Sequence, residues 1–303
     1  MRQATAYAPG HLTGLFQICD QHRDPLHKGA RGSGVSIDLG VYTRVTAVKA
    51  AKTSWSISIN GHETSGAFVS ENVLKKFESK LKSYDKLTVE HFVETPMIAG
   101  FGSSGGGALS LALALNEVCD VGMSRIEASQ VAHVAEIECK TGLGSVFAAE
   151  RGGFGILTEP GAPGVGKAIS YPDTDKLRVV YLHFGPIHTK EALSNAALRA
   201  KINELGGKYV DELSSMVKVE KFMQLSRSFT NHVGLVTPRL KIVLDEMDKK
   251  GYTFTMAMFG EVAFTVTDRT SALEAAEALE IVYPNLEPVV VGIDDDGARL
   301  IYR

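Results

Sequence analysis

The sequence predicts an α/β protein, of the α+β type, built from two domains. The chain has 303 residues, more than one hydrophobic core usually holds, so domains of about 150 residues each are expected. Its first part is rich in β-branched residues, apolar runs of helical length follow, and its last part alternates strands with helices. The glycine- and proline-rich stretch "GGFGILTEPGAPGVG" is the expected boundary, which divides residues 1–165 from residues 166–303.

The first half should begin with strands. "VSIDLGVYTRVTAV" is rich in β-branched residues, and Asn60-Gly61 separates two further strand-like runs. Asn-Gly is a strong hairpin signal, because both residues tolerate a positive φ. Ser70 can cap a helix that extends to about residue 83, and residues 87–94 alternate apolar and polar side chains as a half-buried strand does.

Two helices are expected next, over residues 104–119 and 124–139. The second opens with Ser124 and carries Glu127 three residues later, which is the pattern of a capping box. After the boundary we expect a ferredoxin-like split βαβ unit with extra helices in its first crossover. Its predicted elements are a strand at 177–184, helices within 190–250, a hairpin around residue 260, a helix at 271–280 and a strand at 287–293.

Composition excludes several classes of protein. With 44% hydrophobic residues, 22% charged residues and a net charge of -3, the chain has neither a disorder signature nor a basic surface for nucleic acid. Three widely spaced cysteines indicate neither a disulfide framework nor a zinc site. The N-terminus has no apolar signal region, and no apolar run is long enough to cross a bilayer. We therefore expect a cytoplasmic protein without a nucleic acid or membrane partner.

A glycine stretch, "PMIAGFGSSGGGALSLALALNEV", precedes the first of these helices. It has no lysine after its glycines, which excludes a P-loop, and a dinucleotide fingerprint should follow a buried strand near the start of a domain. The pattern instead favours phosphate binding by the free N–H groups and dipole of a helix N-terminus. Tight packing alone is the alternative, although packing does not require the two serines at the helix tip.

The same stretch resembles the P-x-x-x-G-L-G-S-S motif of the GHMP superfamily of small-molecule kinases, with Phe101 in place of leucine. "APGHLTGLF" near the N-terminus and "FTMAMFGEVAFTV" near the C-terminus resemble the superfamily's first and third motifs. The resemblance implies an S5-like N-terminal domain that binds ATP and a ferredoxin-like C-terminal domain. Many members are dimers, so a homodimer is compatible with it.

Within the superfamily, "DPLHKGARGSGVSIDLGVYTRV", "TGLGSVFAAERGGF" and "EPGAPG" are most similar to archaeal pantoate kinases. This resemblance implies ATP- and Mg²⁺-dependent phosphorylation of the primary hydroxyl of pantoate, to give 4-phosphopantoate for coenzyme A biosynthesis. Another kinase of this superfamily that acts on a small hydroxy acid, of the shikimate or homoserine type, is the nearest alternative. A catalytically silent nucleotide sensor is an alternative from a different class.

The resemblance also assigns residues to the nucleotide and the metal. Ser104 and Glu136 would hold Mg²⁺, with Glu138 as the alternative carboxylate. Helical spacing places Ser129, His133, Glu136 and Lys140 on one polar stripe, with Glu138 toward the apolar face, and an ordinary solvated helix surface is the other interpretation of that stripe. The expected nucleotide-binding residues are Pro96, Gly100, Gly102, Ser103, Ser104, Gly105 and Gly106.

Two positions bear on catalysis. His11 falls where mevalonate kinases have a lysine, so it is expected near the substrate hydroxyl or the transferred phosphoryl group; a structural histidine is the alternative. Ser145 stands where many members have an aspartate base, and a serine does not accept a proton at neutral pH as a carboxylate does. Another group would then deprotonate the substrate, or the site works without a dedicated base.

Recognition of the substrate carboxylate calls for a cation. Asp24, Lys28 and Arg31 lie in the segment "DPLHKGARGSG", and the planar guanidinium of arginine matches a carboxylate best. We therefore expect this segment to face the substrate, with Arg31 as the carboxylate ligand; a charged surface loop is the alternative.

Overall fold

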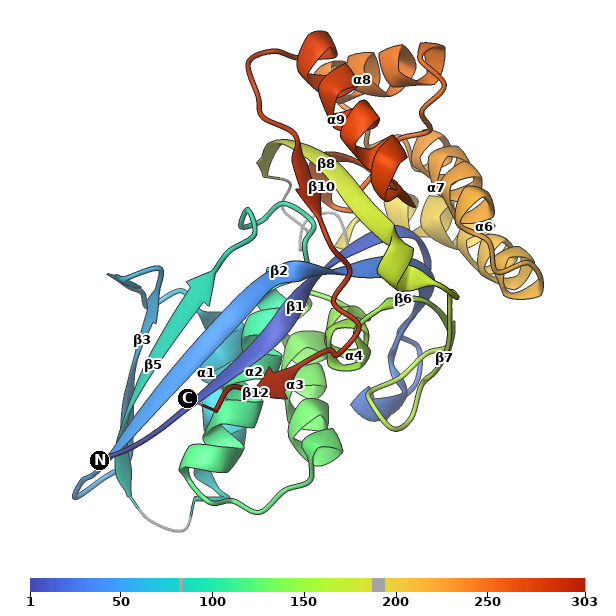
Figure 1. Cartoon of the computed structure of the whole chain (residues 1–303). Helices are drawn as coiled ribbons and strands as arrows, with labels where there is room; N and C mark the ends of the chain where they lie inside the picture. The colour runs from blue at the N-terminus through green and yellow to red at the C-terminus, as the bar shows by residue number, and fades with distance from the viewer. Residues whose placement is uncertain (82–83, 187–193, 303) are drawn as a thin grey trace.

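The computed structural model describes residues 1–81, 84–186 and 194–302, which form two β-sheets with helices packed against them. The two longest strands, β1 (Arg2–Cys19) and β2 (Gly29–Lys49), pair antiparallel along almost their whole length. In Figure 1 this pair runs from the end of the molecule that holds the N-terminus to the region of the second sheet. One long hairpin therefore joins the two halves of the molecule.

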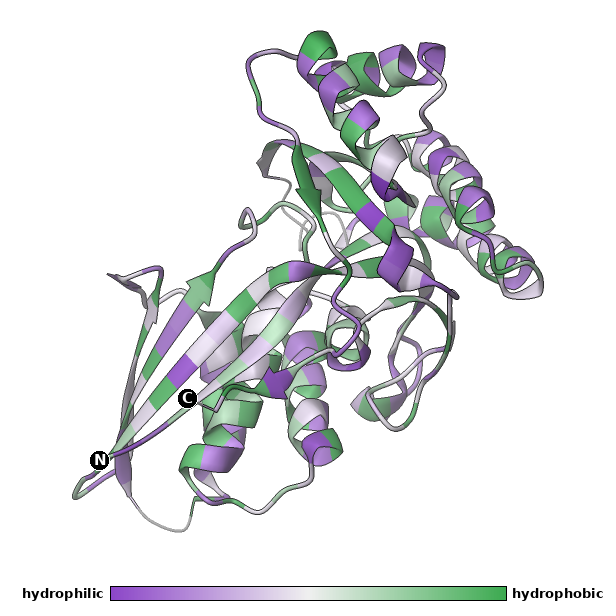
Figure 2. Cartoon of the chain, in the orientation of Figure 1, coloured by the Kyte–Doolittle hydropathy of each residue, from purple (hydrophilic) through white to green (hydrophobic). Residues whose placement is uncertain are grey.

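The first sheet has the strand order β12-β1-β2-β5-β3-β4, and β6 and β7 extend it from the first part of β2. Its pairings are antiparallel except for the parallel pair of β3 and β5. Along β2 and β5, hydrophobic and hydrophilic bands alternate in Figure 2, as expected for strands with one face against a core. The shorter strands are β3 (Ser54–Ile59), β4 (His62–Glu63), β5 (Asp85–Val93), β6 (Phe154–Glu159), β7 (Lys167–Ser170) and β12 (Arg299–Leu300).

Three helices, α1 (Phe68–Glu78), α2 (Ser103–Val118) and α3 (Arg125–Cys139), cover one face of this sheet (Figure 1). The short helix α4 (Ser145–Arg151) follows them. The bounds of α2 and α3 confirm the two predicted helices to within one residue. The capping box at the start of α3 is also confirmed, since both of its hydrogen bonds are present.

The second sheet has the order β11-β8-β10-β9, and the chain passes through it as strand, helices, two strands, helix and strand. This order confirms the predicted split βαβ unit with additional helices in its first crossover. Its elements are β8 (Leu177–Pro186), α6 (Ala196–Ser215), α7 (Val219–Val233), α8 (Pro238–Lys249), β9 (Thr255–Met256), β10 (Gly260–Asp268), α9 (Arg269–Val282) and β11 (Val289–Val291).

Two local sequence signals in the first half of the chain had different outcomes: the predicted hairpin turn is present, but the predicted helix cap is not. Asn60 and Gly61 have φ values of 49° and 81° and form the predicted hairpin turn between β3 and β4. Ser70, however, does not cap α1, which begins at Phe68 without a side-chain cap. The Ser70 hydroxyl lies 3.0 Å from Nε2 of the buried His91 instead. A long-range hydrogen bond thus takes the hydroxyl that was expected to serve the helix end.

The domain boundary near residue 165 stays a prediction. Two strands that come after it, β7 and β12, pair within the first sheet, with β6 and β1. Conversely, Leu12, Leu15 and Phe16 of β1 pack in the hydrophobic core that the second sheet shares. In the described part of the chain, no helix has the length and apolar character needed to cross a membrane.

His91 of β5 is buried in an uncharged network beneath α2. Its Nδ1 lies 2.7 Å from the Thr43 hydroxyl, which is itself 2.6 Å from the Ser110 hydroxyl. Burial lowers the pKa of His91 from 6.5 to about 4. The pKa of His91 is lower in the folded state than in the unfolded chain. The contribution of His91 to folding stability is therefore fully present above pH 6.5 and is lost as the pH falls toward 4.

We expect His91 to make the fold sensitive to acid. Between pH 7 and 4.5 the protein should lose about 2 kcal/mol of unfolding free energy through this side chain, since the unfolded chain gains a proton that the folded chain excludes. Urea unfolding at the two pH values measures this loss. His91→Gln should reduce the loss, and His62→Gln, at an exposed position, should leave it unchanged. An equal loss in the wild type and His91→Gln would contradict the prediction.

Candidate active site

The N-terminus of α2 presents backbone donors without acceptors. Gly102 holds the N-cap position in the left-handed region, with φ 66° and ψ 19°, where a glycine avoids the steric cost of a side chain. The first N–H that bonds within the helix is that of Gly106, which donates to the Gly102 carbonyl at 2.9 Å. Among the described residues, nothing accepts from the N–H groups of Ser103, Ser104 and Gly105. Three free donors and the helix dipole favour an anion here.

A carboxylate lies directly against this helix start. A Cβ atom on Gly105 would come within 2.9 Å of Oε1 of Glu136, and one on Gly142 within 2.5 Å of the same oxygen. Because Gly105 and Gly142 have no side chain, there is room for the Glu136 carboxylate between them. Glu136 belongs to α3 and is only 2% exposed, so helix packing fixes its position.

Glu136 has hydrogen bonds but no paired cation. The Ser145 hydroxyl donates to its Oε2 at 2.7 Å, and none of the described basic side chains forms an ion pair with it. Burial raises the pKa of Glu136 to about 7, although the Ser145 hydroxyl and the Val146 N–H partly oppose this. A cation beside the carboxylate would remove this cost of burial.

The residues present fit a magnesium site of the kind completed by phosphates. Mg²⁺ is usually held by one or two carboxylates together with substrate phosphates and water. Within the described residues, no three histidine, cysteine, aspartate or glutamate side chains converge as a protein-only metal site. The buried carboxylate of Glu136 and the exposed side chain of Ser104, at the tip of α2, offer oxygen ligands for such a site.

Three residues of the predicted polar stripe of α3, Ser129, His133 and Glu136, are buried, whereas Lys140, at the C-cap, is exposed. Ser129 donates to the Arg125 carbonyl at 2.8 Å, and His133 Nε2 lies 3.2 Å from the Pro25 carbonyl and 3.0 Å from the Lys28 carbonyl. The prediction that Glu138 lies toward the apolar face was wrong. Glu138 is exposed and forms an ion pair with Lys76 at 2.8 Å, so it does not reach the helix start of α2.

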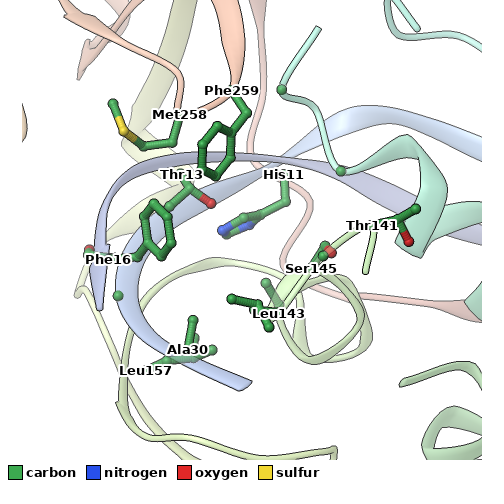
Figure 3. A pocket seen from close by; sticks show the side chains of 18 residues that line it. His11, Thr13, Phe16, Ala30, Thr141, Leu143, Ser145, Leu157, Met258 and Phe259 are labelled. Carbon is green, nitrogen blue, oxygen red and sulfur yellow. The ribbon is translucent and has the colours of Figure 1, made fainter. Parts of the chain in front are cut away.

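A cavity of about 120 Å³ lies beside the N-terminus of α2. It is bounded by residues of β1 and β2, by the turn before α4 and by Met258 and Phe259 (Figure 3). Gly100 and Gly102 of the glycine stretch also line it, so the cavity adjoins the free backbone donors. A small ligand in the cavity would lie next to an anion bound at the helix.

His11 is the titratable side chain in this cavity. Its ring points into the space between Phe16 and Ser145 in Figure 3, and its backbone N–H donates to the Phe101 carbonyl at 2.8 Å. Its Nδ1 lies 3.2 Å from the Ser36 hydroxyl. Burial lowers the pKa of His11 to about 4, so the ring is neutral at pH 7.

The structure does not bring Asp24 and Lys28, which were predicted to bind the substrate, into the cavity. Asp24 is exposed, and its carboxylate accepts from the Leu26 N–H at 2.9 Å. Lys28 is half-buried, and it meets His133 through its backbone carbonyl rather than its ammonium. Neither residue lines the cavity.

Arg31 does not line the cavity either, although its neighbours Ala30 and Gly32 do. Its guanidinium instead donates to the Thr158 carbonyl at 2.8 Å and pairs with Asp211 of α6. Arg31 thus joins β2 to the second half of the chain.

Pro96, Gly106 and the side chain of Ser103 are not placed as free phosphate donors, although the backbone N–H of Ser103 is. The N–H of Gly106 is already bonded within α2, the Ser103 hydroxyl lies 3.0 Å from that of Thr95, and Pro96, which has no N–H, is outside the cavity lining. Thr141, which lines the cavity and whose buried hydroxyl has no partner among the described residues, was not singled out from the sequence. The turn "TGLG" after α3 was the signal available for it.

Comparison with known proteins agrees with this arrangement. Models of the GHMP kinase N-terminal and C-terminal domains match residues 68–153 and 208–285. Pantoate kinases from Methanocaldococcus jannaschii and Thermococcus kodakarensis are each 32% identical to 90% of this chain, which covers 96% and 91% of those proteins. A solved structure described as a phosphotransferase related to the coenzyme A biosynthesis pathway is 28% identical, with a TM-score of 0.88 over 99% of this chain and 98% of that one.

The matches span the α2 helix start, Glu136 and the second sheet, and they extend over nearly the whole chain. They confirm the fold expected from the sequence motifs, with one domain of each GHMP type in the predicted order. The chain therefore belongs to the GHMP kinases.

Proposed function

We propose that this chain transfers the γ-phosphoryl group of ATP to the primary hydroxyl of pantoate, giving 4-phosphopantoate in coenzyme A biosynthesis. The observation that carries the proposal is the position of the cavity, which adjoins both the free N–H groups of α2 and the buried Glu136. The similarity to pantoate kinases over 90% of the chain supports pantoate as the acceptor.

The N–H groups of Ser103, Ser104 and Gly105 would bind the phosphates of ATP, since they have no other acceptor among the described residues. Glu136 and Ser104 would hold Mg²⁺ at the same place. When bound, the ion supplies positive charge against the phosphate oxygens during phosphoryl transfer. Ser145 would keep the Glu136 carboxylate in place through its 2.7 Å hydrogen bond rather than act as a base.

The acceptor would occupy the cavity with its hydroxyl toward His11. Thr13 offers a hydroxyl donor to the rest of the molecule, and Thr141 lines the same cavity. The described lining residues include no lysine or arginine, so hydroxyl and backbone N–H groups are the donors available to its carboxylate there. This assignment replaces the expected role of Arg31.

An assay of ADP release across pantoate, shikimate, homoserine and mevalonate tests the proposed acceptor. We expect turnover with pantoate and at least 10-fold lower kcat/KM with the other three, because a site built around one set of polar groups leaves some of them unpaired with another acceptor. Turnover only with a different acid would remove pantoate from the proposal. ATP binding by calorimetry without phosphorylated product from any acceptor would indicate a sensor instead.

A further inference from the structure

Ser36 lies behind His11, on the side of the ring away from the cavity. It is fully buried in β2, and its backbone is fixed on both sides: its N–H donates to the Gly153 carbonyl at 2.8 Å, and its carbonyl accepts from Asp294 at 3.1 Å. Its hydroxyl makes two contacts, at 3.2 Å to His11 Nδ1 and at 3.4 Å to the Ala148 carbonyl.

The two contacts together bear on the tautomer of the neutral ring. A carbonyl oxygen can only accept, so when both contacts are hydrogen bonds the single hydroxyl proton of Ser36 points to Ala148. Nδ1 of His11 can then bond to the Ser36 oxygen only as a donor. In a neutral imidazole, the other nitrogen is then an acceptor with a free lone pair.

Gly34 keeps that second nitrogen accessible. A Cβ atom at position 34 would lie 2.5 Å from Nε2 of His11, so any other residue would cover the nitrogen. Among the described residues, no group is hydrogen-bonded to Nε2, and the ring lines the cavity (Figure 3). The lone pair therefore faces the space in which the acceptor would bind.

We propose that Ser36 is a positioning residue that holds His11 as the Nδ1–H tautomer, so that Nε2 accepts the proton of the substrate hydroxyl. This inference rests on the kinase activity proposed above. The substrate oxygen forms a bond to the γ-phosphorus while the bond from that phosphorus to the bridging oxygen breaks. ADP leaves with the electron pair, and the hydroxyl proton moves to Nε2.

The resulting imidazolium needs no rearrangement around it. Its Nδ1–H already donates to Ser36, whose own proton already points to Ala148. Donors and acceptors that are set before the reaction contribute more than those that must reorient. The pair of His11 and Ser36 would thus do the work of the carboxylate base that many family members have where this chain has Ser145.

The test combines nitrogen chemical shifts with kinetics on the full chain. With ¹⁵N-labelled histidine and His11→Gln to assign the signal, His11 should show a protonated Nδ1 and an unprotonated Nε2 at pH 7. Ser36→Ala should populate the opposite tautomer and lower kcat about 10-fold to 100-fold, with KM for ATP unchanged. Ser36→Thr, which keeps the hydroxyl, should restore both. Ser129→Ala, which removes another fully buried serine hydroxyl, should change neither.

A protonated Nε2 in the wild type would overturn the inference, and this readout needs neither a folded Ser36→Ala variant nor kinase activity. Unchanged kcat in Ser36→Ala would overturn it as well. A chain without turnover on any acceptor would instead contradict the proposed function, while the tautomer measurement would still report on Ser36.

Discussion

Glu136→Gln should lower kcat by about 100-fold or more, because it removes the negative charge that would hold the metal against the phosphates. The amide can still accept from the Ser145 hydroxyl, which lies 2.7 Å from the native carboxylate. The variant should be at least as stable as the wild type, since the native carboxylate is buried without an ion pair and its pKa is raised to about 7. Steady-state kinetics and thermal unfolding measure the two effects.

Glu138→Gln is the matched control, on the same helix and two residues away. Its ion pair with Lys76 is on the surface, where such pairs contribute about 0.2 to 1 kcal/mol. The control should keep full activity. Loss of activity in Glu138→Gln together with full activity in Glu136→Gln would transfer the role to Glu138.

Gly102→Ala should weaken ATP binding at least 10-fold. At φ 66° an alanine carries a steric cost of about 1 to 2 kcal/mol, and its Cβ would lie 3.3 Å from that of Ser145. The backbone would relax away from this conformation, so the N–H groups of Ser103 to Gly105 would no longer point to one place. Titration calorimetry with ATP measures the loss.

Gly122→Ala separates backbone strain from binding. Gly122 has φ 84° and nothing within 4 Å of an added Cβ, so alanine there has a similar steric cost without touching the site. The two variants should lose similar stability in urea, but only Gly102→Ala should lose ATP affinity. Equal ATP affinity in both variants would show that the turn at Gly102 does not bind the nucleotide.

Local signals in the sequence identified elements whose causes are local. The Asn60-Gly61 turn, the capping box of Ser124 and Glu127, and the glycine start of α2 depend on residues within one turn of each other. The long strand β1, which contains Pro9 and Gly10, was not among the predicted elements. Pairing with β2 keeps the chain extended through a register shift at these two residues.

The parts of the site that were misplaced depend on distant partners. Arg31 pairs with Asp211, which is 180 residues away, and no pattern near Arg31 shows this partner or the direction of its side chain. Helical spacing correctly placed Ser129, His133 and Glu136 on one face of α3. The burial of this polar face could not be predicted, because it depends on distant turns that pack on the helix, such as the one that contains Pro25 and Lys28.

The most direct test of the central claim is a crystal structure with a non-hydrolysable ATP analogue, Mg²⁺ and pantoate. We predict phosphate oxygens within hydrogen-bond distance of the N–H groups of Ser103 to Gly105, the ion between them and Glu136, and the pantoate hydroxyl beside His11. A triphosphate bound elsewhere, with the N-terminus of α2 and the adjoining cavity unchanged, would contradict the account.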